Sequence, residues 1–265
     1  MSIYTDVAPA VHGRWTSDSL CREIRMADAV VLTGLRKSFE KREVLCGLDL
    51  TIPEGTVYGL VGPNGCGKTT LFRILAGLLR PTKGTARVLG LAPGSQTARQ
   101  ATGYMTQTEA LYSDLTVEEN VRFFGRLYGL AGNGLAEAAE KAIRLADLWD
   151  RRGSRIDELS GGMRRRASLA CAIVQHPRLL ILDEPTVGVD PELRGTFWDS
   201  FAAWARQGTT LLVSTHHLEE AFHCDVLGLM REGMIIAQGP PRELLRQAGT
   251  ETLEEAFLSF ARRRQ

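Results

Sequence analysis

Glycines, a lysine and two threonines share one short stretch of this sequence, Gly62-Pro63-Asn64-Gly65-Cys66-Gly67-Lys68-Thr69-Thr70. Because glycine has no Cβ, the glycines at 62, 65 and 67 would let the backbone adopt positive φ values and turn its N–H groups toward a polyphosphate. Lys68 would then reach the β- and γ-phosphates, while the Thr69 hydroxyl would bind Mg²⁺ and Thr70 would contact the α-phosphate. An unrelated glycine-rich turn would match this pattern by accident in about one chain in a hundred. The stretch therefore predicts a phosphate-binding loop.

Two adjacent acids, Asp183 and Glu184, follow the aliphatic run 179–182. This order is typical of a central parallel strand that carries carboxylates to its carboxyl end, the edge at which open α/β sheets bind ligands. We expect Asp183 to hold Mg²⁺ through a water molecule. We expect Glu184 to polarise the water that attacks a phosphate, as a general base. The alternative is a strand end with two solvated acids.

Two more polar residues follow short apolar runs and should reach the same edge. Gln107 ends the predicted strand 103–107, and His216 follows the predicted strand 210–214. Gln107 would coordinate Mg²⁺ or its water and sense the γ-phosphate, although a lone glutamine at a strand end is more often an ordinary surface residue. His216 would donate a hydrogen bond to the γ-phosphate, whereas His217 would face away. Lys68, Glu184 and His216 form the predicted catalytic set.

A second helix start has the features of an anion site. Ser160 is the predicted N-cap, and Gly161 and Gly162 follow it before an apolar helical pattern. The free N–H groups of such a helix start point toward an anion.

Phe39, in a polar turn at 37–41, is expected either to stack on a nucleotide base or to pack on the strand beneath it.

The hydrophobic pattern predicts the elements that position these residues. Residues 29–35 and 45–52 alternate as antiparallel strands, and 58–61 form a buried strand that leads into the phosphate loop. Residues 117–130 and 135–148 are amphipathic, residues 131–134 separate them, and no strand is expected until 179. We therefore predict an α/β fold with a mainly parallel central sheet, an antiparallel β subdomain and an inserted α-helical subdomain at about 111–175. The predicted divisions are an N-terminal extension at 1–27, a main domain at 28–240 and a C-terminal helical tail at 241–265.

Composition narrows the class of protein. The 265 residues carry a net charge of +1, which favours neither nucleic acid nor an acidic membrane. Five cysteines without a CxxC pair fit a reducing, cytosolic compartment. No apolar run approaches the ~18–20 residues that span a bilayer, and the N-terminus lacks the apolar core of a signal peptide. We expect that extension to be disordered, with Met26 as an alternative start, and Cys66 to be unusually reactive toward alkylating agents because it lies beside Lys68.

From about Val30 to Gln238 the set of motifs resembles the ATP-binding cassette (ABC) family, the nucleotide-binding subunits of ABC transporters. The resemblance implies a P-loop NTPase fold, ATP and Mg²⁺ as ligands, and ATP hydrolysis. It implies that residues 62–70 are the Walker A loop and 179–184 the Walker B strand, with Gln107 as the Q-loop and His216 as the switch histidine. Nucleotide-binding roles follow for Phe39 at the adenine, for Ser160, Gly161 and Gly162 as the signature, and for Asp190 as the D-loop. Met163 stands where glutamine is commonest in the family, and Phe39 stands where tyrosine is frequent.

The family resemblance also implies partners. Two subunits, expected to be identical, would pair head to tail, so that Ser160 of one closes over the phosphate held by Lys68 of the other. An integral membrane permease would hold the pair at the inner face of the cell membrane, and residues 115–128 would form much of the docking groove. The motifs look most like subunits of ABC-2 type exporters. The alternatives are an ABC-type ATPase of DNA repair or chromosome organisation, one that serves a cytosolic assembly machine, and a phosphate-loop kinase.

Overall fold

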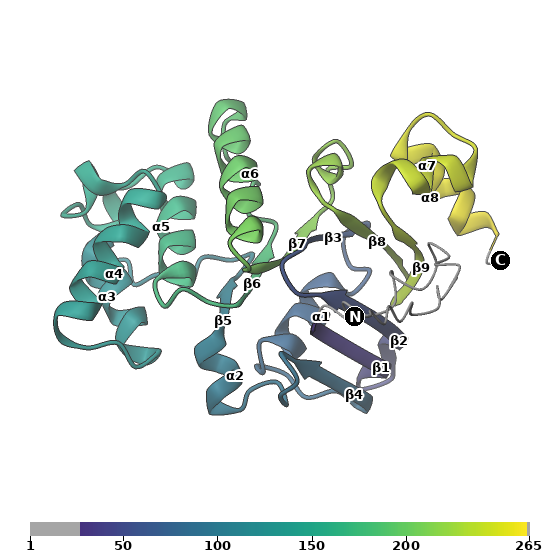
Figure 1. Ribbon diagram of the computed structural model, residues 1–265, viewed down its shortest axis with the longest axis horizontal. Helices are drawn as coiled ribbons and strands as arrows, with labels where there is room; N and C mark the ends of the chain where they lie inside the picture. The colour runs from purple at the N-terminus through teal and green to yellow at the C-terminus, as the bar shows by residue number, and fades with distance from the viewer. Residues whose placement is uncertain (1–26, 264–265) are drawn as a thin grey trace, which may run out of the picture.

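The computed structural model describes residues 27–263 as two sheets with helices packed around them (Figure 1). The predicted N-terminal extension lies outside the described residues, apart from Ala27. The strands are β1 (Asp28–Phe39), β2 (Arg42–Pro53), β3 (Val57–Val61), β4 (Lys83–Val88), β5 (Thr102–Met105), β6 (Leu179–Asp183), β7 (Thr210–Thr215), β8 (Val226–Arg231) and β9 (Met234–Gly239). The α-helices are α1 (Lys68–Leu75), α2 (Gln96–Ala101), α3 (Val117–Leu127), α4 (Gly132–Leu145), α5 (Gly161–Ile173), α6 (Pro191–Arg206), α7 (Pro241–Ala248) and α8 (Leu253–Arg262). Short 3₁₀ turns are η2 (Trp149–Arg151), η3 (Ile156–Glu158) and η4 (Glu220–His223).

The smaller sheet is antiparallel and has the order β2-β1-β4. The predicted antiparallel pair is confirmed, but both strands are longer than expected. Phe39 lies at the end of β1 and pairs with Arg42, so the expected turn at 37–41 shrinks to two residues. An ion pair between Arg36 and Glu43 at 2.9 Å joins the two strands near this end.

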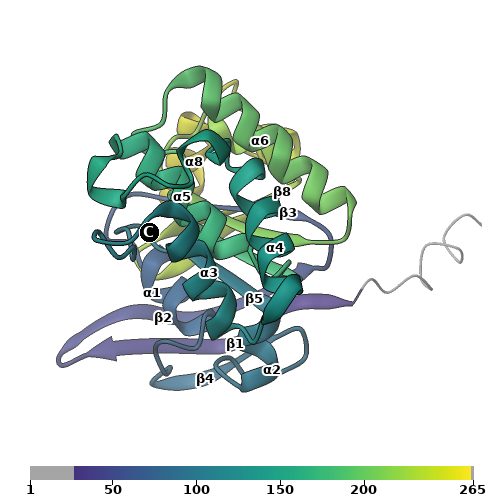
Figure 2. The ribbon, with the colours of Figure 1, turned by 90° about the vertical axis from the view of Figure 1, so that its left-hand side faces the viewer.

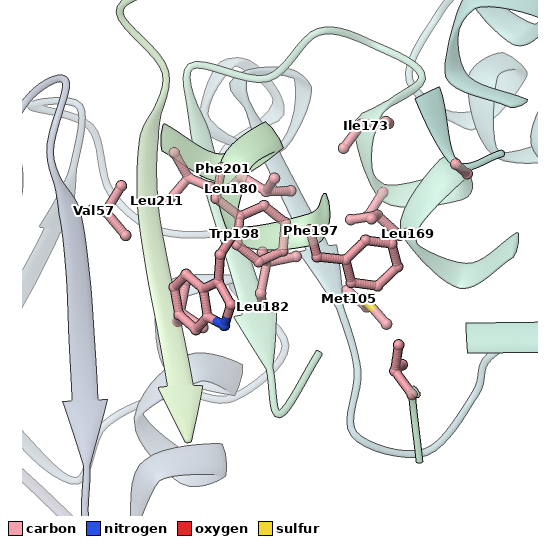
Figure 3. Packing of buried hydrophobic residues seen from close by; sticks show 14 of the residues in the cluster. Val57, Met105, Leu169, Ile173, Leu180, Leu182, Phe197, Trp198, Phe201 and Leu211 are labelled. Carbon is pink, nitrogen blue, oxygen red and sulfur yellow. The ribbon is translucent and has the colours of Figure 1, made fainter. Parts of the chain in front are cut away.

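The larger sheet has six strands in the order β5-β6-β7-β3-β8-β9, and only the β8–β9 pair is antiparallel. Alternate residues of its central strands point to opposite faces, as strand geometry requires. Leu180 and Leu182 pack against the α6 aromatics Phe197, Trp198 and Phe201 (Figure 3). On the other face, Tyr58, Leu60, Leu179, Ile181 and Leu212 form a second core with α1 and the antiparallel sheet. The predicted mainly parallel sheet is confirmed.

Helices α3, α4 and α5 lie between β5 and β6 in the chain and group at one end of the molecule (Figures 1 and 2). The predicted helical insertion is confirmed, with one error of boundary. Residues 132–134, expected in the linker, form the first turn of α4. Gly132, the first of them, has φ = 54°, a left-handed value that glycine adopts without strain. The short helix α2, capped by Ser95, was not predicted.

Helices α7 and α8 lie at the opposite end of the molecule from α3–α5 (Figure 1). Their buried residues Leu244, Leu253 and Ala256 belong to the same core cluster as Leu227 and Leu229 of β8. Between residues 27 and 263, no helix is long and apolar enough to cross a membrane.

Candidate functional site

The carboxyl edge of the larger sheet carries a cavity of about 320 Å³. Four separate segments meet there: strand β2, the β3–α1 loop, the loop after β5 and the residue after β6. The lining residues are Val44, Asn64, Gly65, Gly67, Lys68, Thr69, Thr70, Gln107 and Glu184. A larger hollow of about 530 Å³, lined in part by His176, Arg178 and Trp204, contains none of these residues. We place the candidate site in the smaller cavity because the predicted phosphate-binding groups converge there.

The β3–α1 loop joins a fully buried strand to a helix whose N-cap is Gly67. Gly67 has φ = 116°, a left-handed value that glycine adopts without strain. Its lack of a side chain leaves the first-turn N–H groups of α1 free for an anion. The expectation that Gly62 supplies a positive φ is wrong, because Gly62 is not among the positive-φ glycines. It is required for space instead, since a side chain there would overlap the carbonyl oxygen of Met230.

Lys68 is nearly buried, with 5% of its surface exposed. Its Nζ donates to the carbonyl oxygens of Gly62 at 2.7 Å and Pro63 at 3.2 Å. The ammonium group therefore lies across the inner side of the loop, within the ring of backbone that would surround a phosphate.

Cys66 contradicts the expectation of high reactivity. Its side chain is buried in the apolar core beneath the loop. Burial raises the pKa of the Cys66 thiol, and the nearby Lys68 charge opposes that rise only in part. Since the thiolate is the reactive form, the cysteine should be slow to alkylate. Only the backbone of Cys66 can contribute to the loop.

Asp183, at the end of β6, is completely buried. Its Oδ1 accepts a hydrogen bond of 2.6 Å from the Ser214 hydroxyl of the neighbouring strand β7, whose register places the two residues side by side. Among the described residues, Oδ2 has no hydrogen-bond partner. A buried carboxylate oxygen of this kind needs a partner, and Mg²⁺ prefers oxygen ligands.

Glu184 is 5% exposed and has φ = 52°, which is unusual for a residue other than glycine. Its Oε2 accepts from Gln107 Nε2 at 3.2 Å, and its Oε1 lies 3.3 Å from His216 Nδ1. Its backbone N–H donates to Ser214 Oγ at 2.9 Å. The structure thus brings together Gln107, Glu184 and His216, which the sequence predicted at one sheet edge.

His217 was expected to face away from the γ-phosphate, and this stays a prediction, although its ring does not lie on the opposite side of the chain from that of His216. The two rings lie side by side, with centroids 4.1 Å apart. Strand β7 ends at Thr215, and the Thr215 hydroxyl accepts a hydrogen bond from the backbone N–H of His217. The chain turns there, so the alternation of side chains along a strand no longer applies.

Several predicted nucleotide-binding residues do not line the cavity: Phe39, Gly62, Pro63, Cys66, Ser160, Gly161, Gly162 and Asp190. The predicted catalytic residue His216 does not line it either, and lies with Gly62 and Pro63 at a neighbouring cavity of about 200 Å³. Ser160 is exposed and caps α5 by accepting from Met163 N at 3.3 Å. Asp190 caps α6 in the same way. The Phe39 ring is 45% exposed, with Lys37 Nζ 4.9 Å from its centroid.

Sequence reasoning missed three residues that hold the site together. Ser214 contacts both Asp183 and Glu184, and it follows the aliphatic run 211–213 as a polar residue inside a buried strand, which was a usable signal. Buried Glu220 accepts from Thr186 at 2.8 Å and Thr215 at 3.1 Å, which ties the loops after β6 and β7 together. Arg165 lies one helical turn before the buried Leu169, so the helical periodicity could have predicted its position on the inner face of α5.

Comparison with known proteins places these features in a family. The family model described as "ABC transporter" matches residues 45–187. The chain is 40% identical over 233 residues to the "Probable multidrug ABC transporter ATP-binding protein YbhF" of Escherichia coli (strain K12), which covers 85% of this chain and 40% of that protein. It is 38% identical over 230 residues to the "Nod factor export ATP-binding protein I" of Rhizobium sp. (strain N33), covering 85% of this chain and 76% of that protein.

A solved structure of an ATP-binding subunit of an ABC transporter has the same fold, with a TM-score of 0.80 and 27% identity. The alignment covers 88% of this chain and 99% of that one. With the phosphate loop, the two acids of β6 and the inserted helices all present, the chain belongs to the ABC transporter family, as one of its ATP-binding subunits.

Proposed function

We propose that the chain hydrolyses ATP in the cavity at the carboxyl edge of its larger sheet and that this hydrolysis powers export through a separate membrane subunit. The observation that carries the proposal is the convergence of Lys68, Gln107 and Glu184 on one cavity of about 320 Å³. Lys68 and the loop N–H groups bind the phosphates, and Thr70 contacts the α-phosphate. Glu184 accepts a proton from the attacking water, while Gln107 and His216 hold its carboxylate in place.

Mg²⁺ fits the residues of this site. The unpaired Oδ2 of buried Asp183 and the Thr69 hydroxyl supply hard oxygen ligands, with Gln107 as a further candidate. The ion would neutralise charge on the phosphate oxygens during hydrolysis.

Two copies of the chain pair head to tail around ATP in this proposal. The support is that the helix start at Ser160, Gly161 and Gly162, where Ser160 and Gly161 are exposed and Gly162 is half-buried, does not line the chain's own cavity. Asp190 is exposed as well and belongs to the same interface. Phe39, exposed near the cavity rim residue Val44 in the β1–β2 hairpin, stacks on the adenine.

Export is inferred from the relatives, whose names refer to multidrug transport and to Nod factor export. We place the chain at the inner face of the membrane, held by a permease on the region 115–128. Leu127, which is 65% exposed in this region, and Tyr112, which is 50% exposed three residues before it, support docking there. We further propose residues 28–240 as the ATPase domain and 241–265 as a C-terminal helical tail.

Glu184→Gln tests this function. It should lower ATP turnover by about two to four orders of magnitude while ATP still binds, because the variant lacks the general base but keeps the loop. Light scattering of the variant with and without MgATP should show a monomer that becomes a dimer only with the nucleotide. Glu137→Gln, at an exposed position of α4, is the matched control and should change neither quantity. Wild-type turnover in Glu184→Gln would remove Glu184 from the proposed role.

A further inference from the structure

Arg165 is a buried cation in the middle of the protein. It is 5% exposed, and burial lowers the pKa of its guanidinium, although the charges of Glu109, Asp183 and Glu184 oppose this. Its neighbours Arg164 and Arg166 form ion pairs with Glu109 and Asp147. Arg165 itself has no ion pair within residues 27–263, so backbone carbonyl groups must offset the cost of burying its charge.

Four carbonyl oxygens surround the Arg165 guanidinium and come from two different strand ends. Nη1 donates to Thr106 O at 3.0 Å and Gln107 O at 2.7 Å. Nη2 donates to Asp183 O at 2.8 Å and to Glu184 O. The planar guanidinium can satisfy two such pairs at once, which a lysine ammonium cannot do with the same geometry.

The hydrogen bonds of Arg165 link the chain after β5 to the chain at the end of β6, just beyond the point where the two strands stop pairing. The last parallel pair between β5 and β6 is Met105 with Leu182, and the chain beyond it holds Gln107 on one side and Glu184 on the other. Ser214 holds the Glu184 N–H from the β7 side. On the β5 side, the hydrogen bond from Arg165 holds the Glu184 carbonyl, in a residue whose backbone has a left-handed φ of 52°.

Arg165 also connects Glu184 to a distant surface. It stands on α5, five residues after the N-cap Ser160, which is about 7 Å along the helix axis. Ser160 is exposed at the start of that helix. A small displacement of α5 therefore moves the group that holds the backbone of Glu184.

We propose that Arg165 is a positioning residue that carries the placement of α5 to the Glu184 carboxylate. This inference rests on the proposed role of Glu184, and it explains what holds the Glu184 carboxylate in its catalytic position. When Ser160 engages the nucleotide held by a second copy of the chain, α5 is fixed, and Arg165 fixes the end of β6 in turn. Arg165 has no hydrogen bond to the phosphate loop, so it acts on turnover and not on ATP affinity.

The test compares Arg165→Lys and Arg165→Met with Arg166→Met in the full chain. Arg166→Met is the matched control, because Arg166 is adjacent on α5 and, among the described residues, its side chain donates hydrogen bonds to Asp147 and not to the ends of β5 and β6. We expect kcat to fall about tenfold in Arg165→Lys and about a hundredfold in Arg165→Met, the scale of a misplaced catalytic group, with KM for ATP within about twofold. The control should keep its kcat within about twofold.

Measurement in the Glu184→Gln variant separates a positioning role of Arg165 from a general structural defect. Because Arg165 acts through Glu184, adding Arg165→Met to Glu184→Gln should lower the residual turnover by no more than about twofold. Equal losses in the two backgrounds, or a raised KM with unchanged kcat, would overturn the proposal. If Arg165→Met proves unfolded by its thermal midpoint, Arg165→Lys decides alone, and wild-type kcat in that variant overturns the proposal. Wild-type turnover in Glu184→Gln would instead count against the proposed function itself.

Discussion

The starts of α1 and α5 both offer helix N–H groups to an anion, yet their surroundings differ. At α1 the N-cap is Gly67, which has no side chain to occupy those groups, and the loop lines a cavity with Gln107 and Glu184. At α5 the N-cap is Ser160, whose hydroxyl accepts from Met163 N in an exposed turn. The first turn belongs to a site assembled within one chain, whereas the second has no catalytic group beside it. Under the proposed function, the second turn is half of a site that a partner chain completes.

Of the substitutions that compare the two turns, the largest effect should come from removing the cation of the first turn, Lys68. Lys68→Ala should lower turnover about 100- to 1,000-fold and weaken MgATP binding, because the variant lacks the ammonium that faces the phosphates. Phosphate release and titration calorimetry measure the two effects. Lys83→Ala, at an exposed position that begins β4, should behave as the unmodified chain. Turnover within tenfold of normal in Lys68→Ala would contradict the assignment of the first turn.

The second turn should respond differently to Ser160→Ala. We expect ATP binding to the monomer within about twofold of normal, no ATP-dependent dimer in the Glu184→Gln background, and turnover about tenfold to a hundredfold lower. The lost N-cap also costs about 1 kcal/mol of stability. Thr252→Ala, which removes the equivalent cap of α8, controls for that cost and should leave dimer formation intact. A normal amount of ATP-dependent dimer in the Ser160→Ala, Glu184→Gln double variant would contradict the assignment of the second turn to a partner's site.

The buried residues behind the first site should matter to folding. Glu220→Ala should lower the free energy of unfolding by about 2–4 kcal/mol, because Thr186, Thr215 and Arg194 lose a buried carboxylate partner. Glu219→Ala, next to it and exposed, should change stability by less than about 0.5 kcal/mol. Urea unfolding measures both variants. Equal stabilities would mean that the carboxylate does not link the two loops.

The smallest effect concerns the underside of the phosphate loop. Because burial raises the pKa of the Cys66 thiol, its thiolate fraction at any pH near neutrality is below that of a free thiol. Iodoacetamide at pH 7.5 should therefore label Cys66 at least about tenfold more slowly than glutathione, by site-resolved mass spectrometry, and labelling should accelerate as pH rises. Labelling at the rate of glutathione would show that the loop opens.

Much of the fold and many site positions were predictable because their signals are local. The aliphatic run before Asp183 and the run before His216 predicted strands that end at the same sheet edge, and the glycine pattern predicted the strand–loop–helix around Lys68. Contacts between distant segments were not predictable. Arg165 bonds to carbonyls 58 and 59 residues earlier in the chain, and no periodicity encodes such a partner. The burial of Cys66 depends on the packing of β3, α1 and the antiparallel sheet, and the lysine beside it in sequence suggested the opposite environment.

The backbone of Glu184 has a consequence for engineering. A residue other than glycine with φ = 52° carries strain of about 1–3 kcal/mol. Glycine at this position would relieve that strain, yet it would abolish the proposed general base and its hydrogen bond with Gln107. Variants selected only for relief of this backbone strain would therefore include Glu184→Gly and would be inactive. Position 184 is a place where selection for stability and selection for turnover act in opposite directions.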